Sequence, residues 1–310
     1  MDVDLRQLRA LLAVAEHGSF NRAAVAIDIS QPAVSKSIAA LEHALRTEPF
    51  QRGPRGAVIT KAGEILARAA AGTVNIMQDA EREITSLAHG DGGQLTIGAT
   101  PSTMAGVVPL ACARLAATGR GPSISIREGL DADLVPALEL GEIDILVGPV
   151  ADLHGCPAHL TECTLIEEGL SIGVRPGHRL SMCREIDLHR LSDASWILPG
   201  SGSRFHHLVE TMFSAAAMPW PTTCITTSDL AAQEIIALAS DYVLLLSGIQ
   251  LMGRQSPLIC IPIRNAPRRR IGWRRLTALR PSRAAEDFIE NLSLVVKDAA
   301  SQTAMLSPNA

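Results

Sequence analysis

The residues that could do chemistry in this chain gather at the start of one predicted helix, over residues 32–45. Gln31, Ser35 and Lys36 present an amide, a hydroxyl and an ammonium group at its exposed N-terminal end. Such groups hydrogen-bond to phosphates and base edges. A lysine can donate to guanine, and a glutamine can pair with adenine or with the DNA backbone. We therefore predict that this helix end, Pro32 included, enters a DNA major groove.

Two short helices and a tight polar turn must position these side chains. In SFNRAAVAIDISQPAVSKSIAALE, residues 19–42, Ser19 can cap the first helix and Ser30 the second, and a proline in the first turn loses no helical hydrogen bond. Small residues on the first helix let the second cross closely. The second helix has apolar residues at three- and four-residue steps: Val34, Ile38, Leu41 and Leu45. This pattern predicts a helix-turn-helix unit that reads DNA.

Composition limits the other function classes. At 310 residues with 47% hydrophobic content, the chain can form two or three compact units with real cores. The net charge of -4 gives no bulk support to nucleic-acid binding. Residues 30–61, however, carry five basic side chains against two acidic ones, and dimerisation would double this local excess. We find no 18-residue uncharged apolar run and no export leader, so we expect a cytoplasmic protein without membrane contact.

Cysteine and histidine spacing argues against a metal site or a cofactor. The six cysteines form no C-x-x-C pair, and no histidine stands at zinc-finger spacing: Cys112, Cys156, Cys163, Cys183, Cys224 and Cys260. We expect reduced, mostly buried thiols, with Cys156 and Cys163 as the only close pair worth a redox hypothesis. His206 and His207 lack a partner for a catalytic triad, so we expect an ordinary helix-surface pair.

Three ordered segments at the N-terminus resemble a known family. The likeness is to the winged helix-turn-helix of LysR-type transcriptional regulators, and it rests on LRQLRALLAVAEHGSFNRAA, ISQPAVSKSIAALE, and PFQRGPRGAVIT before KAGEIL. It implies a DNA-binding domain over residues 1–60, with a wing whose Arg52 and Arg55 reach the minor groove or its phosphates. This chain has Arg46 and Pro49 where the family usually has glycine and leucine, which leaves the geometry of the turn into the wing open.

A long helix is predicted over residues 61–89. Apolar residues recur along it at helical spacing: Ile65, Leu66, Ala69, Ile76, Met77, Ala80, Ile84 and Leu87. The resemblance implies that this linker helix pairs with its copy in a second subunit, and the alternative is a helix packed on its own domain. The glycines of HGDGG, residues 89–93, should end it.

Beyond residue 93 the pattern alternates between strand and helix, which is typical of a parallel α/β fold. It predicts strands over residues 95–99, 123–127, 143–147, 170–174, 195–198 and 242–246, and helices over residues 102–117, 133–140, 205–217 and 230–239. The segments GEIDILVGP, LSIGVRPGHRLS, SWILPGSGSR and ITTSDLAAQEIIALASDYVLLLSG resemble the effector-binding region of the same family, whose fold is like that of periplasmic solute-binding proteins. We expect an effector-binding domain over residues 93–300, with a cleft between two subdomains. The first subdomain would contain residues 93–162 and 268–300, ending in a helix over 284–296, and the second residues 163–267.

Candidate effector-binding residues stand where predicted strands end. In open α/β sheets, ligands bind at the carboxyl ends of strands, where helix N-termini point N-H groups into the crevice. The candidates are Thr100, Ser102, Thr103, Ser201, Ser203 and Arg204, with Gly148 and Ser247 at two further strand ends. Hydroxyls, open backbone and an arginine suit an anionic or hydroxylated small molecule. The alternative for Ser102 and Ser203 is that they only cap their helices.

An arginine group near the C-terminus allows two interpretations. It consists of Arg264, Arg268, Arg269, Arg270, Arg274, Arg275, Arg280 and Arg283. It could contact DNA or an acidic partner. Because the group flanks a strand-like segment, residues 271–273, we favour an outward, solvated strand face.

Together these patterns predict a ligand-responsive transcription factor. A small molecule in the cleft would change the closure of the two halves and, through dimer or tetramer contacts, the spacing of the DNA modules; RNA polymerase is a further candidate partner. A solute receptor would need an export signal, and an enzyme would need a charged constellation at the cleft, which we do not find. GSGSR and FQRGPRG look most like the family branch that regulates sugar or aromatic-acid catabolism.

Overall fold

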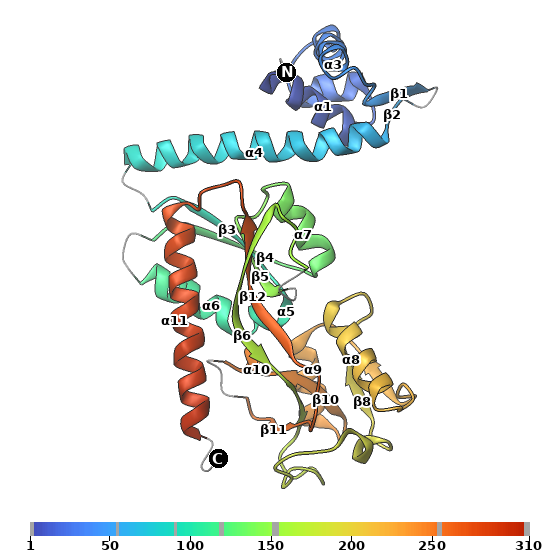
Figure 1. Cartoon of the computed structure of the whole chain (residues 1–310), viewed down its shortest axis with the longest axis vertical. Coiled ribbons are helices and arrows are strands. Elements are labelled where there is room, and N and C mark those ends of the chain that lie inside the picture. Colours follow the sequence, from blue (N-terminus) through green and yellow to red (C-terminus); the bar gives the residue numbers. More distant parts are fainter. Residues whose placement is uncertain are drawn as a thin grey trace. The chain divides into compact units, whose positions relative to one another are not determined.

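The computed structural model describes residues 3–53, 56–89, 92–117, 121–150, 155–252 and 256–306. The chain divides into two compact units (Figure 1), Met1–Gly90 with Glu139–Glu142, and Asp91–Leu138 with Ile143–Ala310. We call them the N-terminal unit and the C-terminal unit. None of the described helices has the length and apolarity that a membrane span requires.

The N-terminal unit contains the predicted helix-turn-helix. Ser19 and Ser30 cap its two helices, since each hydroxyl accepts a hydrogen bond from the backbone N-H three residues later. Ala23 and Ala24 are buried in the shared core, which confirms that small residues let the helices approach closely. In chain order the elements are α1 (Leu5–His17), α2 (Phe20–Ala26), α3 (Gln31–Leu45), β1 (Phe50–Gly53), β2 (Gly56–Ile59) and α4 (Lys61–His89).

The turn from α3 into the wing forms with Arg46 and Pro49 in place. Arg46 follows α3 with a φ of 52°, the left-handed conformation that glycine usually takes at a helix end, and its N-H donates to the Glu42 carbonyl. The Pro49 carbonyl accepts a hydrogen bond from the Thr60 N-H at 2.9 Å. Strands β1 and β2 then pair antiparallel over four residues each. An arginine and a proline therefore still permit the wing hairpin.

Helix α4 is buried on one side and apolar on an exposed side. Ala70 and Val74 belong to the core that α1, α2 and α3 share, so α4 packs on its own unit. Four large apolar side chains nevertheless remain exposed along its described part: Ile65, Ile76, Met77 and Ile84. Exposed apolar residues at this density need a covering partner.

The C-terminal unit contains two five-stranded sheets. The first sheet has the order β4-β3-β5-β12-β6 and the second the order β11-β7-β10-β8-β9. The strands of the first are β3 (Gln94–Ala99), β4 (Ser123–Glu128), β5 (Ile145–Pro149), β6 (Leu160–Glu168) and β12 (Arg269–Leu276). Those of the second are β7 (Leu170–Val174), β8 (Trp196–Leu198), β9 (Cys224–Thr226), β10 (Val243–Ser247) and β11 (Ile259–Pro262).

Helices cover these sheets and complete their cores. Helices α6 and α11 pack on one face of the first sheet, where Phe288 and Leu292 join Leu95 and Ile97, and α7 packs in a separate core with Leu146. The second sheet has a core that includes residues of α8. The helices are α5 (Pro101–Met104), α6 (Val107–Ala116), α7 (Asp131–Glu139), η1 (Leu188–Leu191), α8 (Arg204–Ala215), α9 (Leu230–Ala239), α10 (Gly248–Leu251) and α11 (Arg283–Leu306).

Both sheets are mixed rather than parallel as the alternation predicted. Strands β6 and β12 lie side by side and carry the chain out of the first sheet and back, so they must run in opposite directions (Figure 1). β6 pairs with β12 along its whole length, so residues 163–168 belong to the first sheet and not to the second subdomain as expected. The alternation did not include β6, β9 or β11, the three strands whose side chains are only partly buried and which add to the sheets beyond the predicted set.

The helix predicted over residues 102–117 is in fact two helices, α5 and α6. They are separated at Gly106, where the backbone approaches α10 closely: a Cβ there would lie 2.1 Å from the Ile249 carbonyl oxygen. Only glycine tolerates this approach without displacing α10. Ile249 is itself buried in the core of the first sheet. The break therefore comes from a tertiary contact.

The end of α8 supplies a stability prediction. Ala217 has a φ of 50° at the position where glycine normally ends a helix, and its N-H and that of Met218 donate to the Ser214 and Phe213 carbonyls. Because an L-residue is strained there, we expect Ala217→Gly to raise the unfolding free energy by about 1 kcal/mol. Urea unfolding followed by tryptophan fluorescence measures this.

The matched control for that prediction is Ala216→Gly. Ala216 has a φ of -83°, where glycine relieves no strain and only adds freedom to the unfolded chain. We expect this variant to lose stability. Equal midpoints for the two variants would show that the left-handed conformation costs nothing here.

Each of the six cysteines is a free thiol, but they are not mostly buried as expected: three are half-buried and three are exposed. Burial against the core of the first sheet raises the pKa of the Cys112 thiol to about 11. Since the thiolate is the reactive form, Cys112 should be alkylated about 100-fold more slowly than a thiol of ordinary pKa at mildly alkaline pH. Timed iodoacetamide labelling read by peptide mass spectrometry tests this, with the exposed Cys224 as the internal reference. Labelling of both at one rate would contradict it.

Candidate DNA-reading surface and effector cleft

The polar end of α3 forms one exposed surface. Gln31, Pro32 and Lys36 are exposed and Ser35 is half-buried. Nε2 of Gln31 donates a hydrogen bond to Oγ of Ser35 over 2.9 Å, so these two side chains lie together, one helical turn apart. Apolar residues of the same helix pack inward: Val34, Ile38 and Leu41. The groups suited to bases and phosphates therefore lie on the side of α3 that faces away from the core.

The two wing arginines are placed only in part. The backbone of Arg52 lies in β1, paired with Ala57 of β2. Arg55 lies outside the described residues. A contact of either residue with DNA stays a prediction.

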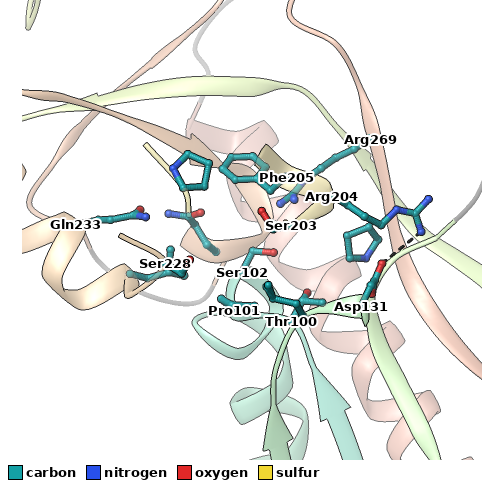
Figure 2. A pocket seen from close by; sticks show the side chains of 15 residues that line it. Thr100, Pro101, Ser102, Asp131, Ser203, Arg204, Phe205, Ser228, Gln233 and Arg269 are labelled. Atoms are coloured by element: carbon teal, nitrogen blue, oxygen red, sulfur yellow. Dashed lines mark hydrogen bonds and ion pairs between the residues drawn. The ribbon is translucent and has the colours of Figure 1, made fainter. Parts of the chain in front are cut away.

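A cavity of about 600 Å³, open solvent included, lies in the C-terminal unit between its two halves. Thr100 and Ser102 line it from the end of β3, and Ser203 and Arg204 line it from the start of α8 (Figure 2). Four of the residues that we predicted from the position of ligand sites at the carboxyl ends of strands thus line one cavity. Much of the remaining wall is apolar: Pro101, Leu130, Pro149, Pro199, Phe205 and Leu230.

The four other predicted effector residues do not line this cavity. Thr103 is buried, and its hydroxyl lies within hydrogen-bond distance of the Thr100 and Val147 carbonyl oxygens. Gly148 leaves room for the Thr100 side chain, since a Cβ there would lie 2.8 Å from Thr100 Cγ2. Ser247 is buried and hydrogen-bonds within the first turn of α10. Ser201 is exposed on the turn before α8. A position at a strand end therefore does not ensure that a residue lines the cavity, because a side chain such as that of Thr103 or Ser247 can point into the protein core.

The alternative that these serines only cap helices applies to Ser203 but not to Ser102. Oγ of Ser203 accepts a hydrogen bond from the His206 N-H at 2.9 Å, so Ser203 caps α8 while it also lines the cavity. Ser102 lies inside α5, whose N-cap residue is Thr100, and it is no cap. The Ser102 hydroxyl therefore has no capping duty that would compete with a ligand.

Arg269 is a cavity residue that the sequence argument missed. Only 9% of its side chain is exposed, and its Nε donates to Oε1 of Glu168 over 2.8 Å. Its guanidinium carbon lies 4.8 Å from the ring centroid of Phe205. Nη2 of Arg269 is buried without any hydrogen-bond partner. Burial lowers the pKa of this guanidinium, and the Glu168 carboxylate opposes the shift.

Asp131 is the second missed residue of the cavity wall. Its Oδ1 accepts a hydrogen bond from Nη2 of Arg274 at 2.8 Å, and its Oδ2 accepts one from Nη1 of Arg204 at 3.3 Å. Arg274 is 4% exposed and also donates to the Pro149 carbonyl. Two arginines thus neutralise Asp131 and hold the start of α7 against β5 and α8.

The arginine group is not the solvated strand face that we favoured. Arg268 is exposed and pairs with Glu167, as that interpretation requires, but Arg269 and Arg274 are buried. A regular strand would place residues five apart on opposite faces. The register shift between residues 271 and 272 lies between these two arginines. The extra residue of this bulge is Leu165 of β6, so β12 keeps its alternation and the two arginines lie on opposite faces of it. Each face is covered: Arg269 lies against Glu168 and Phe205, and Arg274 lies against Asp131.

Only His207 is the ordinary helix-surface residue that the sequence predicted, because the His206 side chain is 15% exposed and packs against Trp220. His207 is exposed and contacts Glu210 at 3.0 Å. Nδ1 of His206 contacts the Pro199 carbonyl at 3.2 Å. The described residues contain no group of three histidine, cysteine or acidic side chains that could hold a metal ion.

Comparison with known sequences matches both units. Residues 5–64 match the bacterial regulatory helix-turn-helix protein domain of the lysR family, and residues 88–295 match the LysR substrate binding domain. The regulator GbpR of Rhizobium radiobacter is 27% identical over 290 residues, which cover 90% of this chain and 93% of GbpR. GbpR of Azospirillum brasilense is 30% identical over 239 residues, 76% of this chain and 68% of that protein.

Solved structures share the fold. A full-length OxyR variant from Pseudomonas aeruginosa superposes with a TM-score of 0.69 at 22% identity, covering 95% of this chain and 96% of OxyR. Full-length CbnR in complex with its target DNA gives a TM-score of 0.63 at 19% identity, covering 94% of this chain and 100% of CbnR. Because both of its domains match this one family, the chain belongs to the LysR-type DNA-binding transcriptional regulators and carries the effector-binding domain of that family, so it is not an enzyme.

Proposed function

We propose that this regulator binds a small-molecule effector in the cavity between the two halves of its C-terminal unit and changes its operator binding in response. The observation that carries the proposal is that one cavity is lined from both halves, by Thr100 and Ser102 on one side and Ser203 and Arg204 on the other. A ligand that contacts both sides favours the closed arrangement over an open one. Thr103, Gly148 and Ser247 would support the walls rather than touch the effector, and Ser201 would stay on the exposed turn before α8.

We propose that α4 pairs with its copy in a second subunit. The exposed apolar residues Ile65, Ile76, Met77 and Ile84 support this, because pairing would remove them from water. A dimer presents two copies of α3 to one operator, and pairs of dimers would extend the bound site. The effector would then act on the spacing of the DNA-binding units, in the cytoplasm and in reach of RNA polymerase. Control of sugar or aromatic-acid catabolism stays a prediction from GSGSR and FQRGPRG.

We propose that the exposed end of α3 reads the major groove through Gln31, Pro32, Ser35 and Lys36, while Arg52 and Arg55 contact phosphates or the minor groove. The first experiment is recovery of genomic DNA fragments by the purified protein. We expect a few inverted-repeat sites, lost in the Gln31→Ala, Lys36→Ala double variant. No enrichment over random fragments at moderate salt would reject DNA reading by this surface.

Affinity measurement on a recovered site separates base reading from phosphate contact. We expect Lys36→Ala to cost about 1–3 kcal/mol of specific binding because a donor to guanine is lost. His43→Ala is the matched control, since His43 is exposed near the other end of the same helix. An equal loss on specific and random DNA would assign Lys36 to phosphate instead.

A further inference from the structure

One group in the cleft is left incompletely bonded by the protein itself. Nη2 of Arg269 has no hydrogen-bond partner although the side chain is nine-tenths buried. Buried donors of this kind are rare in native proteins, and a charged one is the most costly to leave unpaired. A missing acceptor is therefore the feature of this cavity that most needs an explanation.

The neighbouring acid neutralises Arg269 only in part. Glu168 meets Arg269 through Oε1, while its Oε2 accepts a hydrogen bond from the Ile249 N-H at 2.6 Å. The Glu168 carboxylate is thus divided between a guanidinium and a backbone donor. Among the described residues that line the cavity, Asp131 has the only carboxylate, and Arg204 and Arg274 already hold it. No acid of the wall is left for Arg269.

Arg269 lies close to the N-terminus of α8, whose backbone N-H groups are further hydrogen-bond donors for a ligand. Figure 2 shows its guanidinium beside Phe205 and above Ser203, at the start of α8. The N-H groups of Arg204 and Phe205 are the first two of that helix and have no acceptor within it. A helix N-terminus and a buried guanidinium on one cavity wall both favour negative charge.

The other cavity walls indicate what the anionic group is attached to. They are formed largely by proline, leucine and phenylalanine side chains, with polar groups of Thr100, Ser102, Ser228, Gln233 and Gln250 between them, besides the paired Asp131. Such a surface binds an apolar or aromatic body and adds few polar contacts.

We propose that the effector is an organic carboxylate with an apolar body, and that its carboxylate accepts hydrogen bonds from Nη2 of Arg269. This rests on the proposed function of the cleft and narrows it, because it makes the anionic group the feature that the site selects. Arg269 then bridges Glu168 and the ligand. The ligand is thereby tied to β6 and β12, the two strands that connect the halves.

Matched acid and amide probes test the proposal on the full-length protein. The pairs are benzoate with benzamide and hexanoate with hexanamide, which keep the shape and change only the charge. Binding is followed by calorimetry at constant ionic strength, with sodium chloride as the balancing salt. We expect each acid to bind about tenfold more tightly than its amide, as a charge-assisted hydrogen bond in a buried site implies.

Paired substitutions identify the residue responsible. Glu168→Gln combined with Arg269→Gln removes both charges and keeps side chains that can hydrogen-bond to each other, so no buried charge is left alone. In this variant the preference for acid over amide should disappear. The matched control is Glu167→Gln combined with Arg268→Gln, which removes the adjacent, exposed pair and should keep the preference.

Three results of these measurements would contradict different parts of the proposal. Equal affinity of the wild type for acid and amide would overturn the proposal while leaving the cleft as a ligand site. Retention of the preference in the Glu168, Arg269 double variant would overturn the role of Arg269, and failure of both acids to bind would reject a carboxylate effector. Failure of the proposed regulator itself would appear separately, in the recovery of DNA fragments, which requires no ligand.

Discussion

Glu168→Ala should lower the unfolding free energy of the C-terminal unit by about 3–5 kcal/mol. The substitution leaves the nine-tenths-buried guanidinium of Arg269 without its acid and the Ile249 N-H without its acceptor. Removing one partner of a buried pair costs more than the pair contributes, because the remaining charge stays desolvated. Glu168 ends β6 and Arg269 begins β12, so the loss falls where the two sheets are joined.

Tryptophan fluorescence during urea unfolding reports on this unit alone. All three tryptophans of the chain, Trp196, Trp220 and Trp273, lie in it. Glu167→Ala is the matched control, because Glu167 pairs with the exposed Arg268 and should lose at most about 1 kcal/mol. Replacing Glu168 and Arg269 together by methionine should restore much of the loss. Equal midpoints for the Glu168→Ala and Glu167→Ala variants would contradict the assignment of a buried pair.

Gly63→Ala should destabilise the N-terminal unit by about 3 kcal/mol, against the sign that helix propensity alone predicts. Gly63 is in the first turn of α4, where alanine is the better helix former. A Cβ at this position would however lie 2.1 Å from the Pro49 carbonyl oxygen and 2.8 Å from Cγ1 of Ile59. That carbonyl is fixed by the Thr60 N-H, so the wing and α4 must move apart.

The N-terminal unit has no tryptophan, which separates its unfolding from that of its neighbour. We expect the Gly63→Ala variant to lose helical circular dichroism at lower urea and to bind DNA less tightly, with an unchanged fluorescence transition. Gly72→Ala, in the same helix, would create no contact under 3.6 Å and should follow propensity, with a gain of up to about 1 kcal/mol. A stabilised Gly63→Ala variant would show that the wing yields easily.

Local patterns determined a large part of this protein. Apolar periodicity and the serine caps predicted α2 and α3, and the long stripe from residue 61 predicted α4 over Lys61–His89. These features can be predicted from the sequence because each depends on neighbours within one or two turns of the same helix. The resemblance to one family at both ends of the chain supplied the architecture, which the family matches confirm.

Tertiary structure decided what no local pattern contains. Gly106 breaks a predicted helix because α10 packs against it, and β6 belongs to the first sheet because β12 returns beside it. The same return strand turns Arg269 inward. An arginine in a basic run has the same local sequence whether it faces water or a cleft. Arg269 is buried because it pairs with Glu168, which lies 101 residues earlier in the chain. The sequence by itself determined that this chain is a DNA-binding regulator with an effector-binding domain, whereas only the folded chain, through contacts between distant residues, determined which side chains meet in the cleft.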